Sequence, residues 1–179
     1  MFDIGDKVVY PHHGAGSVVR KELRTVLGQE REYLTIQILH NDMVVNVPTE
    51  NAERVGLRRV IDEIMVEQVL EVLHGSGTSM PKNWNRRFKF NRDKMKTGDI
   101  FELAEVVRNL SLREQDKGLS TGEKQMFVKA KKILASELRY AKQMDEDEAG
   151  VWLEDVLATV GNVGNGKKKT TKVAAGAGA

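Results

Sequence analysis

The sequence predicts an α+β protein, in which a small N-terminal β barrel is followed by an all-α domain of about five helices. Two observations lead to this division. Residues 7–48 contain short alternating or β-branched stretches separated by turn residues, which is typical of strands. From residue 60 onward, apolar residues recur at the spacing of an amphipathic helix. We therefore expect a sheet domain over residues 1–55 and a helical domain over residues 60–158.

The clearest strand signal is the alternation over residues 32–39. Leu34, Ile36 and Ile38 fall on one face of this strand and are expected to form the core. Gly28-Gln29 lies between two strand segments and is typical of a hairpin tip. Strands this short, with turns this close together, indicate a small barrel near the lower size limit for independent folding.

The helical half carries recognisable start and stop signals. Gly98 and Asp99 are typical of a helix end followed by the N-cap of the next helix. Ser120 and Glu123 form a capping box, in which each side chain accepts a hydrogen bond from the other residue's backbone amide. A separate helix, unusually basic, is expected over residues 83–96.

Composition excludes several classes of protein. The 179 residues include no cysteine, which excludes a disulfide framework and a Cys-based zinc site. No apolar run approaches the roughly 20 residues that cross a bilayer, and the N-terminus lacks the apolar segment of a secretory signal. We therefore expect a cytoplasmic protein with no membrane contact. No long heptad seam is visible, which favours a monomer, and residues 161–179 are expected to be a disordered basic tail.

The motifs of catalysis and cofactor binding do not occur in the sequence. It contains no Walker-type phosphate loop and no GxGxxG, HExxH or GxSxG pattern. Of the four histidines, only His12 and His13 are adjacent, and neighbouring side chains on a strand point to opposite faces. We expect no enzyme activity, no catalytic residue, no metal site and no cofactor.

Positive charge is concentrated in one segment of the chain. The net charge is only +2. Residues 82–96 nevertheless contain a single acidic residue, Asp93, among many basic ones. The basic residues are Lys82, Arg86, Arg87, Lys89, Arg92, Lys94 and Lys96. Clustering of this kind is typical of a surface that binds nucleic acid, although a solvated helix with one buried aromatic residue is the alternative.

Trp84 lies at the start of this basic helix, beside Arg86, Arg87 and Lys89. A tryptophan at this position can staple the helix start to its surroundings. It can also project as an apolar wedge into a nucleic-acid groove, while the basic side chains bind phosphates. Nothing in the sequence resembles a recognition helix that presents an Asn, Gln and Arg set to bases in the major groove, so we do not expect sequence-specific binding.

Six short blocks of the sequence, taken in order, resemble one known family, the CarD-type transcription regulators. The blocks in the first half are VYPHHG at 9–14, VPTENA at 47–52 and VGLR at 55–58. Those in the second half are NWNRR at 83–87, AEVVRNL at 104–110 and GLSTGEK at 118–124. The similarity extends over residues 2–158.

The resemblance implies a Tudor-like (SH3-like) barrel that binds the β subunit of RNA polymerase, a module that transcription-repair coupling factors share. It also implies that the helical domain contacts promoter DNA at the upstream edge of the transcription bubble, largely independently of sequence. In the family, the tryptophan that matches Trp84 wedges into the minor groove and stabilises the open promoter complex. Arg86 and Lys89 match contacts to the DNA backbone, and Lys124 is a further expected contact. We include Arg87 among the DNA-binding candidates.

On the barrel, the resemblance assigns Arg24 and Val26 to positions that face the polymerase. They lie on a strand that could add edge to edge to the partner's sheet. Asn46 stands where several relatives carry a basic residue, just before a Val-Pro pair. One ionic contact is therefore expected to be missing from the polymerase interface.

Two other functions are compatible with the residues. A general DNA-binding or nucleoid architectural protein would bind free duplex with a steep salt dependence, and the moderate net charge argues against it. A polymerase-bound adaptor would instead recruit another protein through its helices. The resemblance favours a global regulator that binds polymerase and stabilises the open complex.

Overall fold

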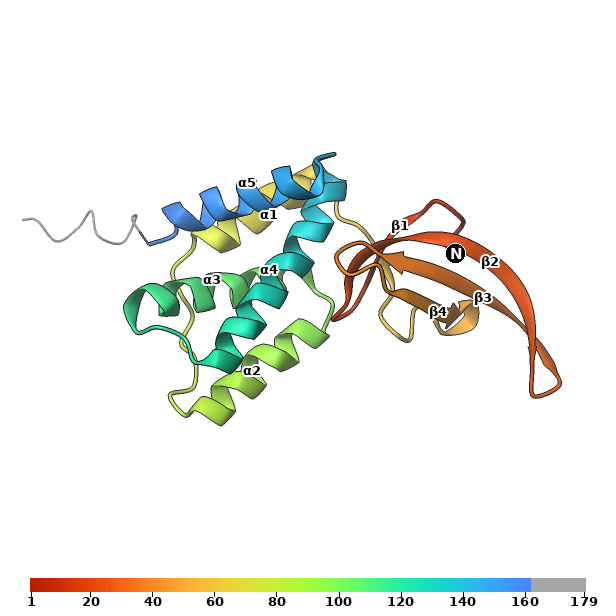
Figure 1. The fold of residues 1–179 in the computed structure, drawn as a ribbon, viewed down its shortest axis with the longest axis horizontal. Helices are drawn as coiled ribbons and strands as arrows, with labels where there is room; N and C mark the ends of the chain where they lie inside the picture. Colours follow the sequence, from red (N-terminus) through yellow and green to blue (C-terminus); the bar gives the residue numbers. More distant parts are fainter. Residues whose placement is uncertain (162–179) are drawn as a thin grey trace, which may run out of the picture.

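The computed structural model describes residues 1–161 and consists of a five-stranded sheet followed by five helices (Figure 1). The strands are β1 (Lys7–Tyr10), β2 (Gly14–Val26), β3 (Gln29–Ile38), β4 (Val44–Pro48) and β5 (Arg58–Arg59), with a short 3-10 helix η1 (Thr49–Asn51) before β5. The helices are α1 (Glu63–His74), α2 (Trp84–Lys96), α3 (Ile100–Asp116), α4 (Thr121–Ala141) and α5 (Glu146–Thr159). The predicted α+β class is confirmed. The predicted tail, beyond Gly161, lies outside the described residues.

The sheet is open, and the closed barrel expected from the sequence is therefore wrong. Its strands are antiparallel and follow the order β4-β3-β2-β1-β5, so that β4 and β5 form its two edges. Short strands at both ends, with β5 only two residues long, give too little pairing to close a cylinder. The sheet also continues to Arg59, beyond the expected domain end at residue 55.

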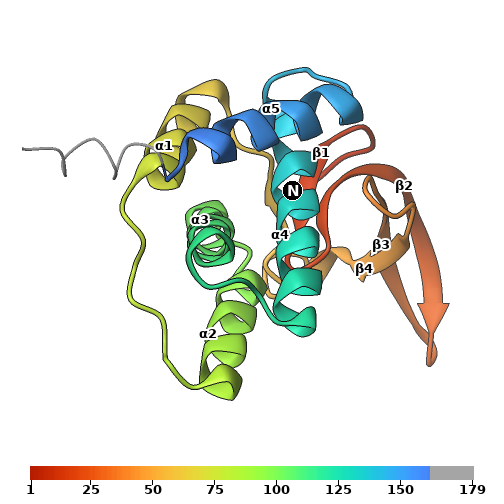
Figure 2. The same ribbon diagram turned by 60° about the vertical axis from the view of Figure 1, so that its left-hand side comes forward.

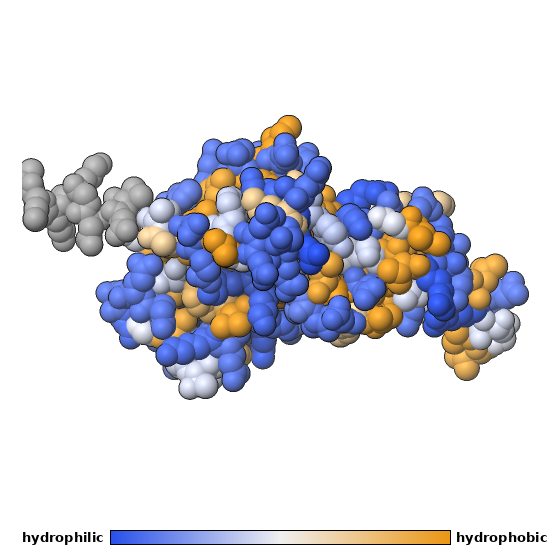
Figure 3. Space-filling model, turned by 45° about the horizontal axis from the view of Figure 1, so that its top comes forward, coloured by the Kyte–Doolittle hydropathy of each residue, from blue (hydrophilic) through white to orange (hydrophobic). Residues whose placement is uncertain are grey.

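β2 and β3 run on past the other strands as a curved two-stranded arm, visible in Figure 1. A register shift between Val18 and Arg20 marks a bulge, and bulges increase the local twist of a strand pair. The arm ends in a tight turn at Leu27 and Gly28, whose φ angles are 52° and 77°. Such left-handed pairs suit the twist of a two-residue hairpin. Exposed hydrophobic side chains gather at this end of the molecule (Figure 3).

The sheet has its own small core on one face. Leu34, Ile36 and Ile38 are fully buried there, as their alternation predicts. The other members of this core are Val8, Val18, Val47, Ala52 and Leu57. A core of eight buried residues is modest, so packing against the helices adds to the stability of this half.

The helices form a second core around α3, which contacts α1, α2 and α4. Each helix starts at a polar N-cap whose side chain accepts a backbone amide hydrogen bond. The capping box at Ser120 and Glu123 and the N-cap at Asp99 are confirmed. In two views, α4 is the helix that lies between the other helices and the sheet (Figures 1 and 2), and it packs on β2. Within residues 1–161, no helix is long and apolar enough to cross a membrane.

Candidate functional site

Trp84 is both exposed and held in place. It is the first residue of α2, and its side chain is 43% exposed. The indole Nε1 donates a 2.8 Å hydrogen bond to Ser120 Oγ, and the ring stacks on Phe88 with centroids 5.3 Å apart. Gly122 lies beside this packing, since a Cβ there would be in ordinary contact, at 3.5 Å, with both the indole and the Phe88 ring. A rigid aromatic side chain presented to solvent is suited to insertion between stacked groups.

Two helix N-termini meet at this tryptophan. Asn83 caps α2 by accepting from the Arg86 amide at 3.1 Å, and Ser120 caps α4 by accepting from the Glu123 amide at 3.3 Å. The Trp84–Ser120 hydrogen bond therefore joins the two starts directly. Helix N-termini carry partial positive charge and free amide groups, which attract anions such as phosphate.

Three of the predicted DNA-binding cations are exposed around these helix starts. Arg86 lies in the first turn of α2, and Lys89 follows it with its side chain 67% exposed. Lys124 lies one turn into α4 and is 60% exposed. Their ion pairs are weak surface ones, with Lys89 2.5 Å from Asp93 and Lys124 3.9 Å from Glu114. We call Trp84, Arg86, Lys89 and Lys124 the wedge surface.

Arg87, also predicted as a DNA contact, lies inside the protein instead. It is 4% exposed, and its Nε donates a 2.5 Å hydrogen bond to Glu123 Oε1. Its Nη1 donates to the backbone oxygens of Pro81 and Lys82 at 3.2 and 2.8 Å. Arg87 therefore fastens α2 and the loop before it to α4, and the assignment to DNA is wrong for this residue.

A spacing signal could have identified the inward face of α2. Arg87, Asn91 and Met95 follow one another at intervals of four, and all three are buried. Glu123, at the N3 position of the capping box, supplies the buried counter-charge. Burial alone would raise the pKa of Glu123, but hydrogen bonds from Arg87 and Ser120 outweigh it and lower that pKa.

The other candidate surface is on the arm. β1 pairs with β2 only as far as Ser17, so the rest of β2 faces no further strand among residues 1–161. Its free edge runs along residues 19–26 and offers unpaired backbone groups, an arrangement that can accept a strand from a partner. Val26 is 41% exposed and Leu27, at the tip, is fully exposed.

Of the three predicted polymerase contacts, Arg24 and Val26 lie on β2 of this arm, and Asn46 lies on β4. Arg24 Nη2 lies 3.5 Å from Asn46 Oδ1, and Arg24 also pairs with Glu22 and lies over the ring of Tyr33. Asn46 Oδ1 accepts a 2.9 Å hydrogen bond from Thr35 Oγ1, which ties β4 to β3. Asn46 is therefore a neutral side chain that is already bonded within the sheet. We call Arg24, Val26, Asn46 and the free β2 edge the arm surface.

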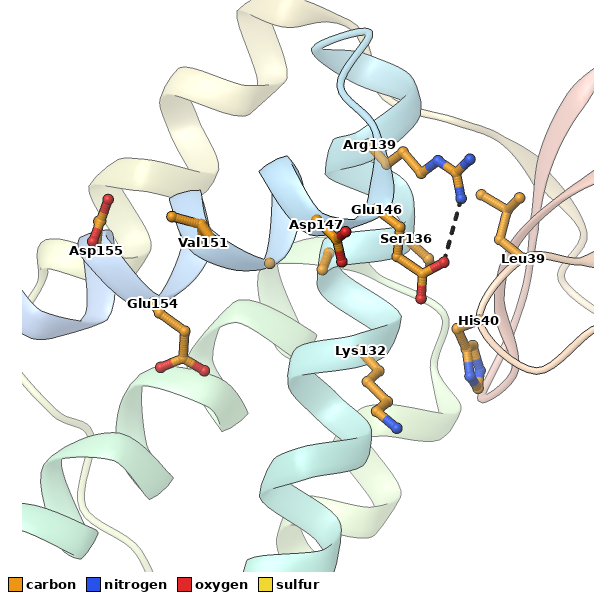
Figure 4. Close-up of a pocket in the computed structure, with 12 residues that line it drawn as sticks. Leu39, His40, Lys132, Ser136, Arg139, Glu146, Asp147, Val151, Glu154 and Asp155 are labelled. Atoms are coloured by element: carbon orange, nitrogen blue, oxygen red, sulfur yellow. Dashed lines mark ion pairs between the residues drawn. The ribbon is translucent and has the colours of Figure 1, made fainter.

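A separate hollow of about 600 Å³ lies between the β3–β4 turn, α4 and α5 (Figure 4). Arg139 and Glu146 form an ion pair of 3.7 Å at one end of it. Ser136 in its wall is not a free nucleophile, because its Oγ donates to Ile133 O at 2.6 Å and accepts from the Ala15 amide at 3.0 Å. Across residues 1–161, no group of three or more His, Asp or Glu side chains is placed to bind a metal.

The two halves of the chain each match a family model. The CarD-like/TRCF RID domain matches residues 2–61, and the C-terminal domain of CarD matches residues 68–154. The chain belongs to the CarD family. It is 35% identical over 148 residues to the putative transcription factor YdeB of Bacillus subtilis (strain 168), covering 83% of this chain and 97% of YdeB.

A solved structure of an N-terminal domain matches a third of the chain. The solution NMR structure of the 72-residue N-terminal domain of Myxococcus xanthus CarD is 30% identical, with 33% of this chain and 79% of that domain covered and a TM-score of 0.30. Membership in the CarD family confirms the resemblance found in the sequence blocks. It assigns the protein to a class of transcription regulators that interact with RNA polymerase, which is not a family of enzymes.

Proposed function

We propose that this CarD-family protein binds the β subunit of RNA polymerase with its arm surface and promoter DNA with its wedge surface, and so stabilises the open promoter complex as a monomer. The observation that carries the proposal is the Trp84–Ser120 hydrogen bond. It holds a half-exposed indole at the meeting point of two helix N-termini, among Arg86, Lys89 and Lys124.

The wedge surface has the parts that bind distorted DNA without reading its sequence. An apolar side chain that enters a base step must offset an unstacking cost of a few kcal/mol. The cations and helix N-termini provide phosphate contacts that are independent of sequence. An indole already fixed by Ser120 and Phe88 loses little further freedom when it binds.

The effect on the promoter follows from differential affinity. DNA at the edge of a bubble is already partly unstacked, so the wedge binds it at a lower cost than intact duplex. A ligand that prefers one state shifts the population toward that state by the ratio of its affinities. The protein then slows closure of the bubble without contacting the active site of the polymerase.

The arm surface provides the tether. A free β2 edge with an exposed Val26 suits strand addition, in which backbone hydrogen bonds supply affinity and side chains supply specificity. Tethering raises the local concentration of the wedge at the promoter, so the weak affinity of the wedge surface for free DNA is sufficient.

The direct test is the half-life of open complexes made by the cognate polymerase, measured with no protein, with the wild type and with Trp84→Ala. We expect the wild type to lengthen the half-life and Trp84→Ala to lose the gain while still binding polymerase. Val151→Ala removes a different exposed apolar side chain, 62% exposed on α5, and should behave as the wild type. Equal half-lives for the wild type and Trp84→Ala would favour the adaptor function instead.

A further inference from the structure

A partly buried ion pair, with Arg58 30% and Glu137 2% exposed, joins the sheet to the helices. Glu137 of α4 accepts two hydrogen bonds from Arg58 of β5, at 2.6 Å from Nη1 and 2.9 Å from Nη2. Its Oε1 also accepts from the Ile61 amide at 3.0 Å, in the segment between β5 and α1. A fork of two parallel bonds fixes orientation as well as distance.

Arg58 extends the same connection to the turn between α2 and α3. Its Nε donates a 2.8 Å hydrogen bond to the backbone oxygen of Gly98. Gly98 has a φ of 76°, and a Cβ there would come within 2.8 Å of Pro11 Cγ, so only glycine allows this approach to the sheet. One guanidinium thus joins β5, α4 and the α2–α3 turn.

The C-terminal half of helix α4 lies against the sheet. There the Ala15 amide donates to Ser136 Oγ. Toward its C-terminal end, the Lys7 ammonium lies 4.8 Å from the centroid of the Tyr140 ring. The first residues of the same helix follow Ser120, which holds the Trp84 indole. This helix therefore links the wedge surface to the base of the arm.

From this geometry we propose that Arg58 and Glu137 are positioning residues, which fix the orientation of the arm surface relative to the wedge surface. The inference rests on the proposed function, because orientation matters only if both surfaces are engaged at once. A tether raises local concentration most when its geometry matches the separation of the two sites. If the two halves were joined by a flexible hinge instead of this ion pair, the wedge surface would occupy many positions, most of them away from the DNA.

A purely stabilising pair would leave the orientation to the surrounding contacts. Buried ion pairs are often no better for stability than apolar residues of the same size. They are directional, however, and one well-supported role of such groups is to select one arrangement over others. The two interpretations predict different results when the pair is broken in a protein that still folds. A positioning role predicts a broader range of distances between the sheet and the helices, and a purely stabilising role predicts no change in that range.

Glu137→Gln is the informative variant. The glutamine keeps the side-chain length and an amide oxygen that can accept from the Ile61 amide, but it loses the charge that binds Arg58. Glu154→Gln is the matched control, because Glu154 pairs with Lys131 of the same α4 helix at 2.5 Å and is 61% exposed. Arg58→Lys is a second test that keeps the charge and removes the fork.

The first measurement is the distance distribution between spin labels on the two halves. The chain has no cysteine, so labels can be placed at Val44→Cys on β4 and Ile64→Cys on α1, which are 55% and 74% exposed. We expect one narrow distribution for the wild type and for Glu154→Gln, and a broad one for Glu137→Gln and Arg58→Lys. Circular dichroism establishes that each variant is folded. A narrow distribution in folded Glu137→Gln would overturn the inference.

The second measurement is the open-complex half-life with the unlabelled variants. We expect Glu137→Gln to reduce the gain produced by the wild type about tenfold, as for loss of a matched tether, with polymerase affinity unchanged within about twofold. Glu154→Gln should keep the full gain. An equal gain from the wild type and Glu137→Gln would overturn the positioning role alone. A wild type without any gain would overturn the proposed function, and the positioning role with it.

Discussion

Trp84 Nε1 and Ser120 Oγ are 2.8 Å apart, and the same Ser120 hydroxyl oxygen accepts the Glu123 amide that starts α4. One side chain therefore caps a helix and fixes the orientation of the indole. A specific hydrogen bond therefore holds Trp84 with one face exposed to solvent. This makes the wedge surface sensitive to a residue that does not itself need to touch DNA.

Replacing Ser120 should loosen the tryptophan. We expect Ser120→Ala to lower the free energy of unfolding by about 1 kcal/mol, the usual cost of losing an N-cap. We also expect faster local motion of Trp84, because its Nε1 loses its acceptor. Fluorescence anisotropy decay measures this motion. The sequence has two tryptophans, so the measurement is made in a Trp152→Phe background, in which Trp84 is the single one.

Ser120→Thr is the control for this prediction, since threonine keeps a hydroxyl that can cap the helix and accept from the indole. It should retain both the stability and the slow decay of the wild type. If Ser120→Ala left the anisotropy decay unchanged, stacking on Phe88 alone would be sufficient to hold the indole, and the role assigned to the hydrogen bond would be incorrect.

Neighbouring arginines should have opposite effects. Arg87→Ala leaves the buried Glu123 carboxylate without its hydrogen-bonded partner and with only Arg113, 3.8 Å away, so we expect a loss of about 3–5 kcal/mol in the free energy of unfolding, measured with urea. Arg86→Ala removes an exposed side chain, and we expect a stability change within about 0.5 kcal/mol.

DNA binding should show the reverse pattern. Arg86→Ala should weaken binding to a bubble-containing duplex and reduce the slope of log affinity against log salt by about 1, as expected for one lost phosphate contact. Folded Arg87→Met, compared at low temperature, should keep the wild-type slope. If Arg87→Met reduced the salt slope and Arg86→Ala left it unchanged, Arg87 would be the residue that contacts phosphate and Arg86 would not.

The β2 edge should be needed for polymerase binding but not for folding. We expect Val26→Glu to weaken binding to the polymerase β subunit at least tenfold, which corresponds to about 1.4 kcal/mol. The new carboxylate would have to be desolvated at an apolar contact. Because Val26 is 41% exposed, the urea midpoint should hardly change. Biolayer interferometry measures the affinity, with Val151→Glu, 62% exposed on α5, as the control. Equal losses in both variants would remove the edge from the interface.

Local signals in the sequence were sufficient to predict the strands and helices. They did not predict whether the sheet closes into a barrel or which distant residues contact one another. The alternation of Leu34, Ile36 and Ile38 predicted the buried face, and Ser120 with Glu123 predicted a helix start, because both depend on neighbouring residues. Whether the strands close into a barrel depends on pairing between β4 and β5, which no local pattern encodes. The open sheet was therefore missed.

The candidate site shows the same division. Trp84, Arg86, Lys89 and Lys124 were recognised by residue type and by resemblance, and their exposure agrees with a surface role. The burial of Arg87 was missed although its four-residue spacing to Asn91 and Met95 was a signal, and its ion pair was missed because Glu123 is 36 residues away. Arg58 and Glu137 are 79 residues apart, and nothing near either one predicts their contact. Pairs of this kind become visible only when the chain is folded.

The histidines at the junction should make stability depend on pH. The pKa of His12 is lowered, first by burial and then by the Lys129, His13 and Lys96 charges, and the Lys129 Nζ lies 3.0 Å from its Nε2. The pKa of His13 is lowered by burial, Lys129 and His40. In the unfolded chain a histidine titrates near about 6.5, so it takes up a proton there before the folded one does.

The free energy of unfolding should therefore fall as pH drops below about 6.5 and level off once the lowered folded pKa values are passed. The range from about pH 7 to 5 isolates this effect, because carboxylates such as Glu123, whose pKa is also lowered, lose their contribution only below about 4.3. His12→Asn should flatten the fall, and asparagine tolerates the φ of 67° at this position. Urea unfolding at a series of pH values measures it. Equal slopes for His12→Asn and the wild type would show that His12 is protonated equally in the folded and unfolded chains.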